Sequence, residues 1–366
     1  LRTRAEQAVT AGTVPGLAIG IGTEGRTTFL EAFGHKQVEP APTPARPDTV
    51  YDLASLTKAL VTTLLAAQAV AEGKLDPATP VANLVPRFTG PGKDVVTVRH
   101  LLAHASGLPP FRPFWQSALE DPTGPAPAPG GVRQHILELC AADPLTYDPG
   151  TKSVYSDTGF ILLGQILETV LEGRLDELAR TRLFAPLGLP RLHFRPPDAP
   201  VGPPKDKIAP TERCPVRGRL IIGEVHDLNA WAMGGVAGHA GLFGSVDDVA
   251  ALASAICRSQ RATNPSPKVL PSEVLRTFFR PAGVPGSTWR LGWDGPAAAG
   301  SLAGERLAKT AIGHLAFTGC SLWIDLQRET FVVILTNRVH PVVRDDPAWK
   351  ALRPALMDAA LEAVGY

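Results

Sequence analysis

The sequence is poor in cysteine and contains no Cys-x-x-Cys pair. Zinc ribbons and dithiol redox sites need closely spaced cysteines, so both classes of site are disfavoured. Free thiols are the expectation, with one disulfide as the open alternative, because a sequence alone cannot pair cysteines. The four residues are Cys140, Cys214, Cys257 and Cys320.

An excess of charge of one sign is also absent. The 36 Lys and Arg residues and the 35 Asp and Glu residues give a net charge of +1, and no long block of either sign occurs. Neither nucleic acid nor an anionic membrane surface is therefore expected as a partner. A small, weakly charged substrate is the simpler expectation. The oligomeric state cannot be inferred from the composition.

Long apolar runs are missing as well. The longest charge-free helical stretch, residues 59–71, falls short of the roughly 20 residues that span a bilayer, so no transmembrane segment is predicted. The chain begins at Leu1 rather than at methionine, which leaves the localisation open. A periplasmic or extracellular protein is expected if an export signal was removed, and a cytoplasmic one otherwise.

What is present predicts an α+β fold. Apolar strands are expected at residues 17–23 and 27–33, and a second hairpin near the C-terminus turns at residues 326–329. The sequence between these hairpins has helical periodicity and contains two proline-rich loops. We therefore expect an antiparallel sheet built from both termini and flanked by helices, with an inserted, mostly helical domain.

The predicted sheet domain comprises residues 1–75 and 240–366, and the inserted helical domain comprises residues 76–239. The active site is expected between these two domains. The proline-rich loops, at residues 109–131 and 190–219, are expected to set substrate specificity, because long loops in compact domains often overhang a site.

One short motif suggests chemistry. In "YDLASLTKAL", Lys58 follows Ser55 by three residues, which on a helix places the amine one turn along the same face. This spacing suits a serine nucleophile with a lysine base, although the motif alone is weak and an ordinary helix start is the competing interpretation. The apolar run that follows predicts a buried helix, so partial desolvation is expected to lower the pKa of Lys58.

Two later stretches carry further candidate groups. Tyr155 and Asp157 stand in "SVYSDTGF", just before a predicted helix, where a tyrosine could carry a proton if a cation lowers its pKa. His314 opens a predicted strand in "GHLAFTGCSLW". The order Ser55 and Lys58, then Tyr155, then His314 is more specific than any one of these motifs.

This arrangement resembles the serine penicillin-recognising family: class C β-lactamases, D-alanyl-D-alanine carboxypeptidases and family VIII esterases. The segments "TVRHLLAHASGLP", "IAPTERCP", "GEVHDLNAWAMGGVAGHAGLFGSVDDVA" and "GCSLWIDLQRETFVVILTNRVHP" also look like segments of this family. The resemblance extends over nearly the whole chain. It implies a β-lactamase/transpeptidase-like fold and serine chemistry, with no metal and no organic cofactor.

The resemblance also implies roles for single residues. Ser55 would be acylated, Lys58 would accept or orient its proton, and Tyr155 would be the second base. The backbone N–H groups of Ser55 and Phe317 would form the oxyanion hole. His239, in a glycine-rich turn, would line a wall of the cleft.

Three positions depart from the family pattern. Leu315 lacks the hydroxyl that holds a substrate carboxylate, and Ala316 replaces a glycine that lets the acyl chain approach the strand. Asp157 stands where asparagine is more usual, and a carboxylate paired with Lys58 should keep that lysine charged. We therefore expect proton transfer to shift toward Tyr155 and the substrate to be an ester or a small acyl compound.

His314 in place of the lysine of other members predicts activity that changes between about pH 6 and 8, because histidine titrates near 6.5. His100 and His104 have a metal-compatible spacing, but no third ligand is evident and structural packing is favoured. Asp227 and Glu224 could bind substrate or cap loops, and the sequence does not decide between these roles.

The leading hypothesis is a serine hydrolase that cleaves esters or small acyl and peptide substrates through an acyl-Ser55 intermediate. A β-lactamase or D-alanyl-D-alanine carboxypeptidase is the alternative within the enzymes. A catalytically weak or inactive homologue that acts as a binding or scaffold protein is the alternative of another class.

Overall fold

The structure is a computed structural model that describes residues 1–119, 132–197 and 201–366. Parts of both predicted proline-rich loops, residues 120–131 and 198–200, lie outside the described residues. The first loop was predicted to be irregular, but its described part contains the short helix α5 (Phe114–Leu119). In the second loop lie three two-residue strands, which are β5 (His193–Phe194), β6 (Arg213–Cys214) and β7 (Arg219–Leu220).

A six-stranded sheet joins the two ends of the chain, in the order β3-β2-β1-β11-β10-β9. Its two central strands, β1 and β11, come from opposite ends of the sequence and pair antiparallel, with Ile19 opposite Ile334. Both predicted hairpins are thereby confirmed. The strands are β1 (Gly16–Thr23), β2 (Arg26–Gln37), β3 (Thr43–Pro44), β9 (Ile312–Leu315), β10 (Ser321–Asp325) and β11 (Thr330–Thr336).

Alternate side chains along these strands belong to two different apolar clusters. In β11, Val333 and Leu335 belong to the large cluster on the helical side, whereas Val332 and Ile334 belong to a smaller one on the other face. Successive side chains of a strand point to opposite faces, so a run that is apolar throughout can serve two layers. The sheet is therefore buried on both sides.

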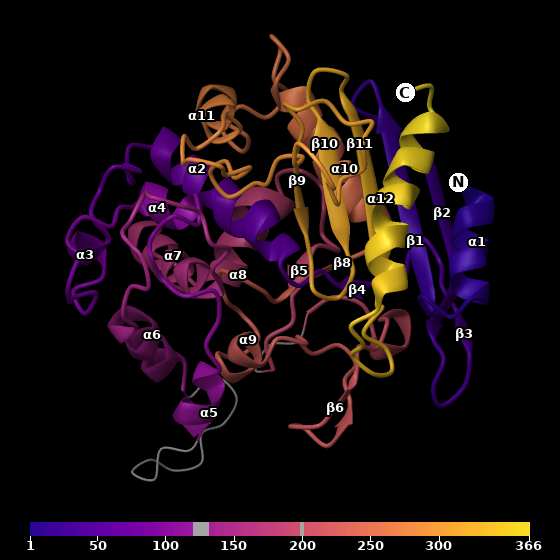
Figure 1. The fold of residues 1–366 in the computed structure, drawn as a ribbon, viewed down its shortest axis with the longest axis horizontal. Coiled ribbons are helices and arrows are strands. Elements are labelled where there is room, and N and C mark those ends of the chain that lie inside the picture. The colour runs from indigo at the N-terminus through magenta and orange to yellow at the C-terminus, as the bar shows by residue number, and fades with distance from the viewer. Residues whose placement is uncertain (120–131, 198–200) are drawn as a thin grey trace.

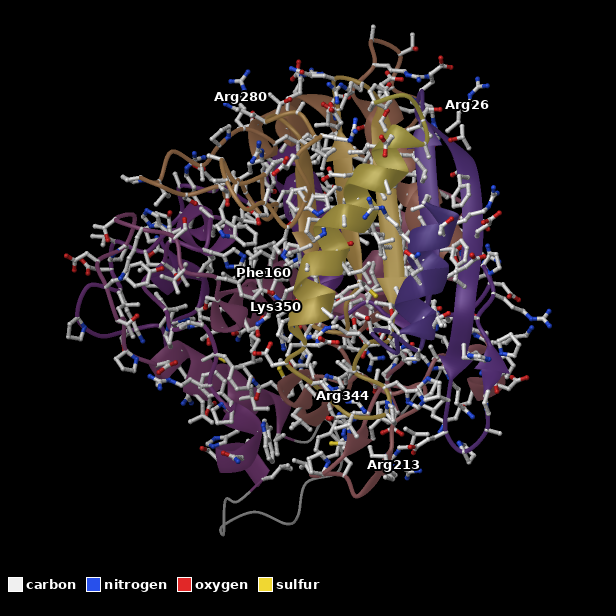
Figure 2. All side chains as sticks on the ribbon, turned by 45° about the vertical axis from the view of Figure 1, so that its right-hand side comes forward. Arg26, Phe160, Arg213, Arg280, Arg344 and Lys350 are labelled. Atoms are coloured by element: carbon white, nitrogen blue, oxygen red, sulfur yellow. The ribbon has the colours of Figure 1, made fainter. Side chains whose placement is uncertain are left out.

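Helices cover both faces (Figure 1). On the outer face, α1 (Arg2–Thr10) and α12 (Pro347–Glu362) pack against the smaller cluster, and on the inner face α10 (Val246–Ser259) packs on β1, β2 and β11. Ser245 caps α10, since its side chain accepts a hydrogen bond from the N–H of Asp248. Figure 2 shows α12 lying across the sheet, with Phe160 inside the molecule and Arg26 at its surface.

The middle of the chain is mostly helical, as predicted. It contains the π-helical segments η1 (Lys58–Thr63) and η2 (Ala179–Phe184), the 3₁₀ turn η3 (Lys205–Lys207) and a small sheet of β4 (Tyr51–Asp52), β8 (Leu242–Gly244) and β5. The helices are α2 (Leu64–Ala71), α3 (Val81–Leu84), α4 (Val98–Leu102), α6 (Arg133–Ala142), α7 (Asp157–Val170), α8 (Leu175–Leu178), α9 (Leu228–Ala232) and α11 (Ser272–Phe278).

The division into residues 1–75 with 240–366 and 76–239 stays a prediction. Within the described residues, no helix has both the length and the apolarity needed to cross a membrane. All four cysteines are buried and free, which confirms the expectation of thiols.

Candidate active site

Ser55 lies in the turn between β4 and η1. The preceding residue, Ala54, has a φ of 43°, a left-handed conformation that is uncommon for a residue with a side chain. Its N–H donates to Oδ1 of the buried Asp52 at 2.8 Å, and Oδ2 of the same carboxylate accepts the N–H of His226 at 2.7 Å. Asp52 therefore fixes the serine turn and the His226 segment with one carboxylate.

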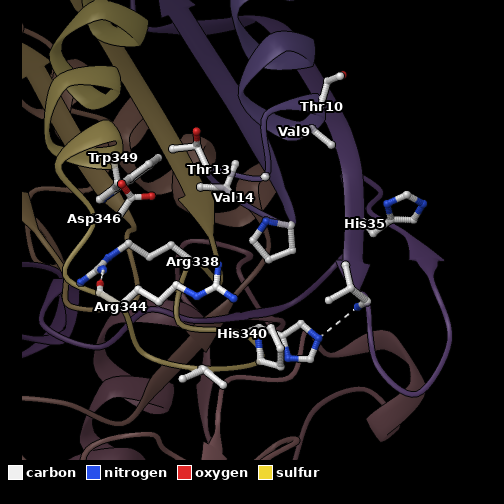
Figure 3. A pocket seen from close by; sticks show the side chains of 15 residues that line it. Val9, Thr10, Thr13, Val14, His35, Arg338, His340, Arg344, Asp346 and Trp349 are labelled. Carbon is white, nitrogen blue, oxygen red and sulfur yellow. Dashed lines mark hydrogen bonds between the residues drawn. The ribbon is translucent and has the colours of Figure 1, made fainter.

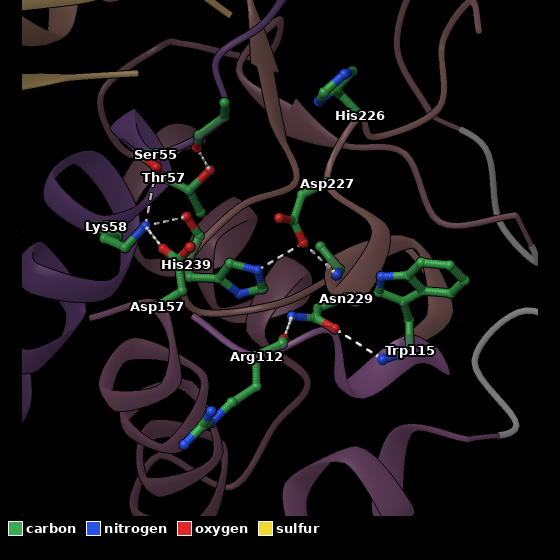
Figure 4. Close-up of polar contacts among 12 residues, drawn as sticks. Ser55, Thr57, Lys58, Arg112, Trp115, Asp157, His226, Asp227, Asn229 and His239 are labelled. Carbon is green, nitrogen blue, oxygen red and sulfur yellow. Dashed lines mark hydrogen bonds and ion pairs between the residues drawn. The ribbon is translucent and has the colours of Figure 1, made fainter. Parts of the chain in front are cut away.

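Lys58 begins η1 one turn after Ser55, as the sequence predicts. Its side chain is fully buried, and Nζ lies within reach of three oxygens: Ser55 Oγ at 3.0 Å, the backbone oxygen of His239 at 2.9 Å, and Asp157 Oδ1 at 2.7 Å (Figure 4). An ammonium group has three N–H donors, so each of these oxygens can accept one of them.

The pKa of Lys58 does not fall as the burial argument predicts. Burial lowers it, but the opposing influence of Asp157 and Tyr155 is larger, and the pKa is raised above its ordinary value. The expectation of a neutral amine was wrong because it treated the lysine without its carboxylate. The expectation that Asp157 holds Lys58 charged agrees with this geometry.

Tyr155 stands two residues before α7, next to the N-cap residue Ser156. Its hydroxyl donates to Ser55 Oγ at 2.8 Å, and its ring lies 4.9 Å from Lys58 Nζ. Ser156 caps α7 by accepting the N–H of Gly159 at 3.2 Å, which fixes the residue before it at the helix start. Burial raises the pKa of Tyr155 to about 12, although Lys58 opposes the shift.

Two buried histidines and a tryptophan surround the Tyr155 ring. The ring centroids of His104, Trp289 and His314 lie 4.7, 5.7 and 5.9 Å from it. His104 is not on a helix as predicted, because α4 ends at Leu102 and His104 has a φ of 52°. Its Nδ1 accepts the N–H of Ser156 at 3.0 Å, which is the structural role that we favoured.

The prediction made for His314 was wrong. The residue is the third of β9 rather than its first, and it is fully buried. Burial, together with the charge of Lys58, lowers the pKa of His314 to about 3. It therefore stays neutral between pH 6 and 8 and cannot supply the pH dependence that was expected from a free histidine.

The residues after His314 divide between two environments. Leu315 packs against the smaller apolar cluster under α1 and α12, and Ala316 is buried, with its N–H bonded to the oxygen of Cys320 at 2.8 Å. His314, Leu315 and Ala316 are not among the described residues that line the cleft at Ser55, so the predicted direct contacts with substrate are not supported. Phe317 does line the cleft, and 52% of its surface is exposed.

The cleft has a volume of about 490 Å³. Among the described residues, the backbone N–H groups of Ser55 and Phe317 donate no hydrogen bond, which leaves both available to an oxyanion. The lining residues are Ala54, Ser55, Pro110, Phe111, Tyr155, Asp157, Glu212, His226, Asp227, Leu228, His239, Ala240 and Phe317.

His239 lines the cleft and also holds Lys58 through its backbone oxygen. Its ring Nε2 lies 2.8 Å from Asp227 Oδ1, and Asp227 also accepts the N–H of Ala230. Although burial would raise the pKa of Asp227, His239 holds it well below its ordinary value. A Cβ on the neighbouring Gly238 would collide with the backbone of α7, so the segment needs glycine there. The sequence could not reveal a role carried by a backbone carbonyl.

The cleft lining also contains Glu212 and His226, which sequence reasoning did not select as site residues. Glu212 Oε1 lies 3.2 Å from His226 Nε2, and the His226 ring stacks on Phe317 at 5.5 Å. Of the two acids left undecided, Asp227 is in the cleft, whereas Glu224 pairs with Arg219 at 2.7 Å and is not among the lining residues.

Comparison with known proteins identifies the family. A family model described as Beta-lactamase matches residues 1–357. The chain belongs to the beta-lactamase family. A protein of Salmonella agona (strain SL483) named "Putative D-alanyl-D-alanine carboxypeptidase" is 32% identical over 324 residues, covering 82% of this chain and 72% of the relative. A protein of the same name from Salmonella typhi is 32% identical over 327 residues, with the same coverage.

Solved structures of the beta-lactamase fold agree with this assignment. EstCE1, described as a hydrolase with promiscuous acyltransferase activity, has a TM-score of 0.75 at 22% identity, with 98% of this chain and 97% of EstCE1 covered. An octameric penicillin-binding protein homologue from Pyrococcus abyssi has a TM-score of 0.71 at 22% identity, with 96% and 75% covered. The predicted resemblance and α+β fold class are both confirmed.

Outside the cleft, this beta-lactamase-family chain has a second cavity of about 450 Å³, near both termini (Figure 3). Arg338, Arg344, His340 and Trp349 are among its lining residues. The guanidinium of Arg338 donates to the backbone oxygen of Arg344 at 2.9 Å. The described lining residues include no serine, cysteine, lysine or tyrosine, so the cavity lacks the groups of a Ser-Lys-Tyr site.

The described part of the chain contains no group of three or more His, Cys, Asp or Glu side chains placed to hold a metal ion. His100 instead completes a capping box on α4: its Nδ1 accepts the N–H of Thr97 at 3.2 Å.

Proposed function

We propose that the chain is a serine hydrolase that works through an acyl-Ser55 intermediate. One observation carries the proposal: Lys58 Nζ and the Tyr155 hydroxyl both lie within 3.0 Å of Ser55 Oγ, at the wall of an open cleft. A nucleophile held by two proton-bearing groups is the arrangement that nucleophilic acyl transfer requires. Family membership supports the same reading.

The charge of Lys58 decides which group takes the serine proton. Two of its three partners, the carbonyl of His239 and the carboxylate of Asp157, can only accept hydrogen bonds. Lys58 is therefore stabilised as an ammonium ion, and its charge partly offsets the burial that raises the pKa of Tyr155 to about 12. We assign the base role to the phenolate form of Tyr155, which is a minor fraction near neutral pH, and an electrostatic role to Lys58.

The reaction then runs in two halves. Tyr155 takes the Ser55 proton while Oγ bonds to the acyl carbon, and the oxyanion is held by the N–H groups of Ser55 and Phe317. Collapse breaks the bond to the leaving group, which takes the proton back from Tyr155. A water molecule, deprotonated by Tyr155, then attacks the acyl-serine, and Ser55 regains its proton as the acid leaves.

Esters and small acyl compounds are the proposed substrates, with small peptides second. The neutral His314 and the apolar packing of Leu315 leave the late strand without a group to hold a substrate carboxylate. The relatives' name favours a D-alanyl-D-alanine carboxypeptidase as the second candidate, and the family name favours a β-lactamase.

Intact-mass spectrometry tests the proposal directly. After treatment with a fluorophosphonate, a labelled penicillin or a p-nitrophenyl ester, the wild-type protein should gain the mass of the acyl or phosphonyl group, and Ser55→Ala should gain none. Labelling of the penicillin with rapid release would promote the β-lactamase alternative. No adduct with any probe and equal ester hydrolysis by both proteins would favour an inactive binding homologue.

A further inference from the structure

The charged side chains that line the cleft are nearly all acidic. Asp157, Glu212 and Asp227 contribute carboxylates, whereas the described lining residues include no lysine and no arginine. Segments 120–131 and 198–200 contain no lysine, arginine or histidine in the sequence. Among the described lining residues, the only basic side chains are therefore those of His226 and His239.

The net charge of the described lining residues together with Lys58 has an upper limit. The ammonium of Lys58, behind the wall, is the cation paired with Asp157. Three carboxylates and one ammonium give a net charge of −2 when both histidines are neutral, and of 0 when both are protonated. Glu212 and Asp227 keep their charge, since the pKa of each is lowered.

The buried histidines nearby do not change this limit. Burial lowers the pKa of His104 and of His314 well below the ordinary value, so both are neutral at physiological pH. The described lining residues therefore include no permanently charged cation.

Two guanidinium groups contact these residues without being part of the lining: that of Arg217 donates to the backbone oxygen of His226 at 2.7 Å, and that of Arg338 lies 5.4 Å from the Phe317 ring centroid. A carboxylate brought into the cleft would lose its hydration and gain no counterion from the described lining residues.

We propose that the cleft selects acyl substrates that carry a cationic amine and discriminates against substrates that end in a carboxylate, with Glu212 as the residue that binds the cation. The proposal rests on the acyl-transfer function given above and names the substrate class for that site. It differs from what the relatives' name implies, because a peptide ending in D-alanyl-D-alanine presents a carboxylate.

Among the described lining carboxylates, Glu212 has the longest contact with its partner: His226 lies 3.2 Å from it, whereas Lys58 lies 2.7 Å from Asp157 and His239 lies 2.8 Å from Asp227. Asp157 is engaged by Lys58, and Asp227 by His239 and the N–H of Ala230. Glu212 contacts His226 in the cleft wall, and 14% of its side chain is exposed.

The cleft around Glu212 has one further hydrogen bond that supports it and two exposed aromatic side chains. The N–H of His226 is bonded to Asp52, the same carboxylate that holds the Ser55 turn, so Glu212 and the nucleophile share one support. Phe111 and Phe317 add exposed aromatic surface at the cleft. Aromatic faces attract ammonium groups, and they attract quaternary ones without requiring a hydrogen bond.

A matched set of p-nitrophenyl esters tests the selection. Acyl chains of equal length would end in trimethylammonium, in its neutral tert-butyl isostere, or in carboxylate, at three chain lengths so that reach to Glu212 is covered. We expect kcat/KM to fall in the order cation, neutral, anion, with about a tenfold difference between the two charged esters at the best length. Equal values, or a preference for the carboxylate, would overturn the proposal.

Glu212→Gln keeps the shape of the side chain and removes its charge. It should reduce the ratio of kcat/KM for the cationic ester to kcat/KM for the neutral ester by about fivefold. The control is Glu224→Gln, because Glu224 lies in the same region but pairs with Arg219 and is not among the described lining residues. This variant should leave the ratio unchanged. An unchanged ratio in Glu212→Gln, or an equal loss in both variants, would rule Glu212 out.

A binding measurement separates this proposal from the hydrolase itself. Calorimetry on Ser55→Ala with non-hydrolysable amides of the same acyl chains measures selection without chemistry. Tighter binding of the cationic amide to Ser55→Ala, together with no ester hydrolysis by the wild-type protein, would refute the hydrolase and keep the charge selection. Ester hydrolysis without any charge preference would do the opposite.

Discussion

Two of the cavities of this molecule are nearly equal in size and differ in character. The cleft at Ser55 has about 490 Å³ and three carboxylates in its lining, whereas the cavity near the termini has about 450 Å³ and two arginines in its lining. Of these two, only the cleft brings a serine hydroxyl together with two proton-bearing groups, Lys58 and Tyr155. The difference shows that volume does not identify a site, whereas converging hydrogen bonds on one reactive atom do.

The largest effect is expected from removing the cation of the cleft. Lys58→Met should lower kcat/KM for p-nitrophenyl acetate by about 10³-fold or more, because the phenolate of Tyr155 loses the charge that stabilises it. Fluorophosphonate labelling should slow in parallel. Circular dichroism and the Tm would show whether the variant is folded, and a folded variant with wild-type activity would contradict the assignment.

The second effect is a pH profile that rises into the alkaline range. The pKa of Tyr155 is raised to about 12, so the reactive phenolate becomes more abundant as pH increases toward that value. We expect kcat/KM to increase about tenfold per pH unit between about pH 7 and 9. A plateau reached by pH 7, or a decline over this range, would exclude the Tyr155 phenolate as the controlling base.

Asp157→Asn sharpens this second prediction. Asp157 raises the pKa of Tyr155, so removing its negative charge should lower that pKa while Lys58 keeps its proton. The rising limb of the profile should therefore move to lower pH by about one unit or more. The measurement is kcat/KM against pH for both proteins, and coincident profiles would show that Asp157 does not set the limb.

A smaller effect is expected from the support behind Lys58. Asp227→Asn weakens the contact that anchors the His239 ring and so loosens the backbone oxygen that holds the ammonium. We expect kcat to fall about tenfold with little change in KM, since the loss is in positioning rather than in substrate binding. A change confined to KM would instead place Asp227 in contact with substrate.

The smallest effect is expected in the other cavity. Arg344 is exposed and lies away from Ser55, so Arg344→Ala should change the free energy of unfolding by no more than about 0.5 kcal/mol and ester hydrolysis by less than about twofold. Urea titration and initial rates measure the two quantities. A large loss of activity would show that the two cavities are coupled.

Arg338 is the residue through which such coupling would run. Its guanidinium lies 5.4 Å from the ring centroid of Phe317, which lines the cleft, while its side chain also lines the cavity near the termini. Comparing Arg338→Met with Arg344→Ala would therefore distinguish a local effect on Phe317 from an effect of the cavity as a whole.

Much of the fold could be predicted because it depends on local patterns. The hairpins at both ends show strand-length apolar runs with turn residues between them, and the helical middle shows its own periodicity. The positions of Ser55, Lys58 and Tyr155 could be predicted because a family's order of motifs constrains them jointly. Their contacts with one another agree with that order.

What could not be predicted depends on burial and on backbone atoms. The pKa of His314 is lowered mainly because the side chain is buried. Its burial could not be predicted from the identity of the residue. The contact between Lys58 and the backbone carbonyl of His239 could be made by a residue of any type, so the sequence does not indicate it. The pair of Glu212 and His226 joins segments that are far enough apart in the sequence that only the folded chain brings them to one wall.

The π-helical segment η1 fixes how many residues the chain needs between Lys58 and α2. A π turn links residues five apart, so it contains one residue more than an α turn. Deleting one residue there would turn the π turn into an α turn and leave Ser55 and Lys58 facing much as before, whereas deleting one residue from the regular turns of α2 would rotate both by about 100° relative to the rest of that helix. A relative could thus retain every letter of the Ser-x-x-Lys motif, tolerate a gap within η1, and be silenced by a single gap in the helix that follows.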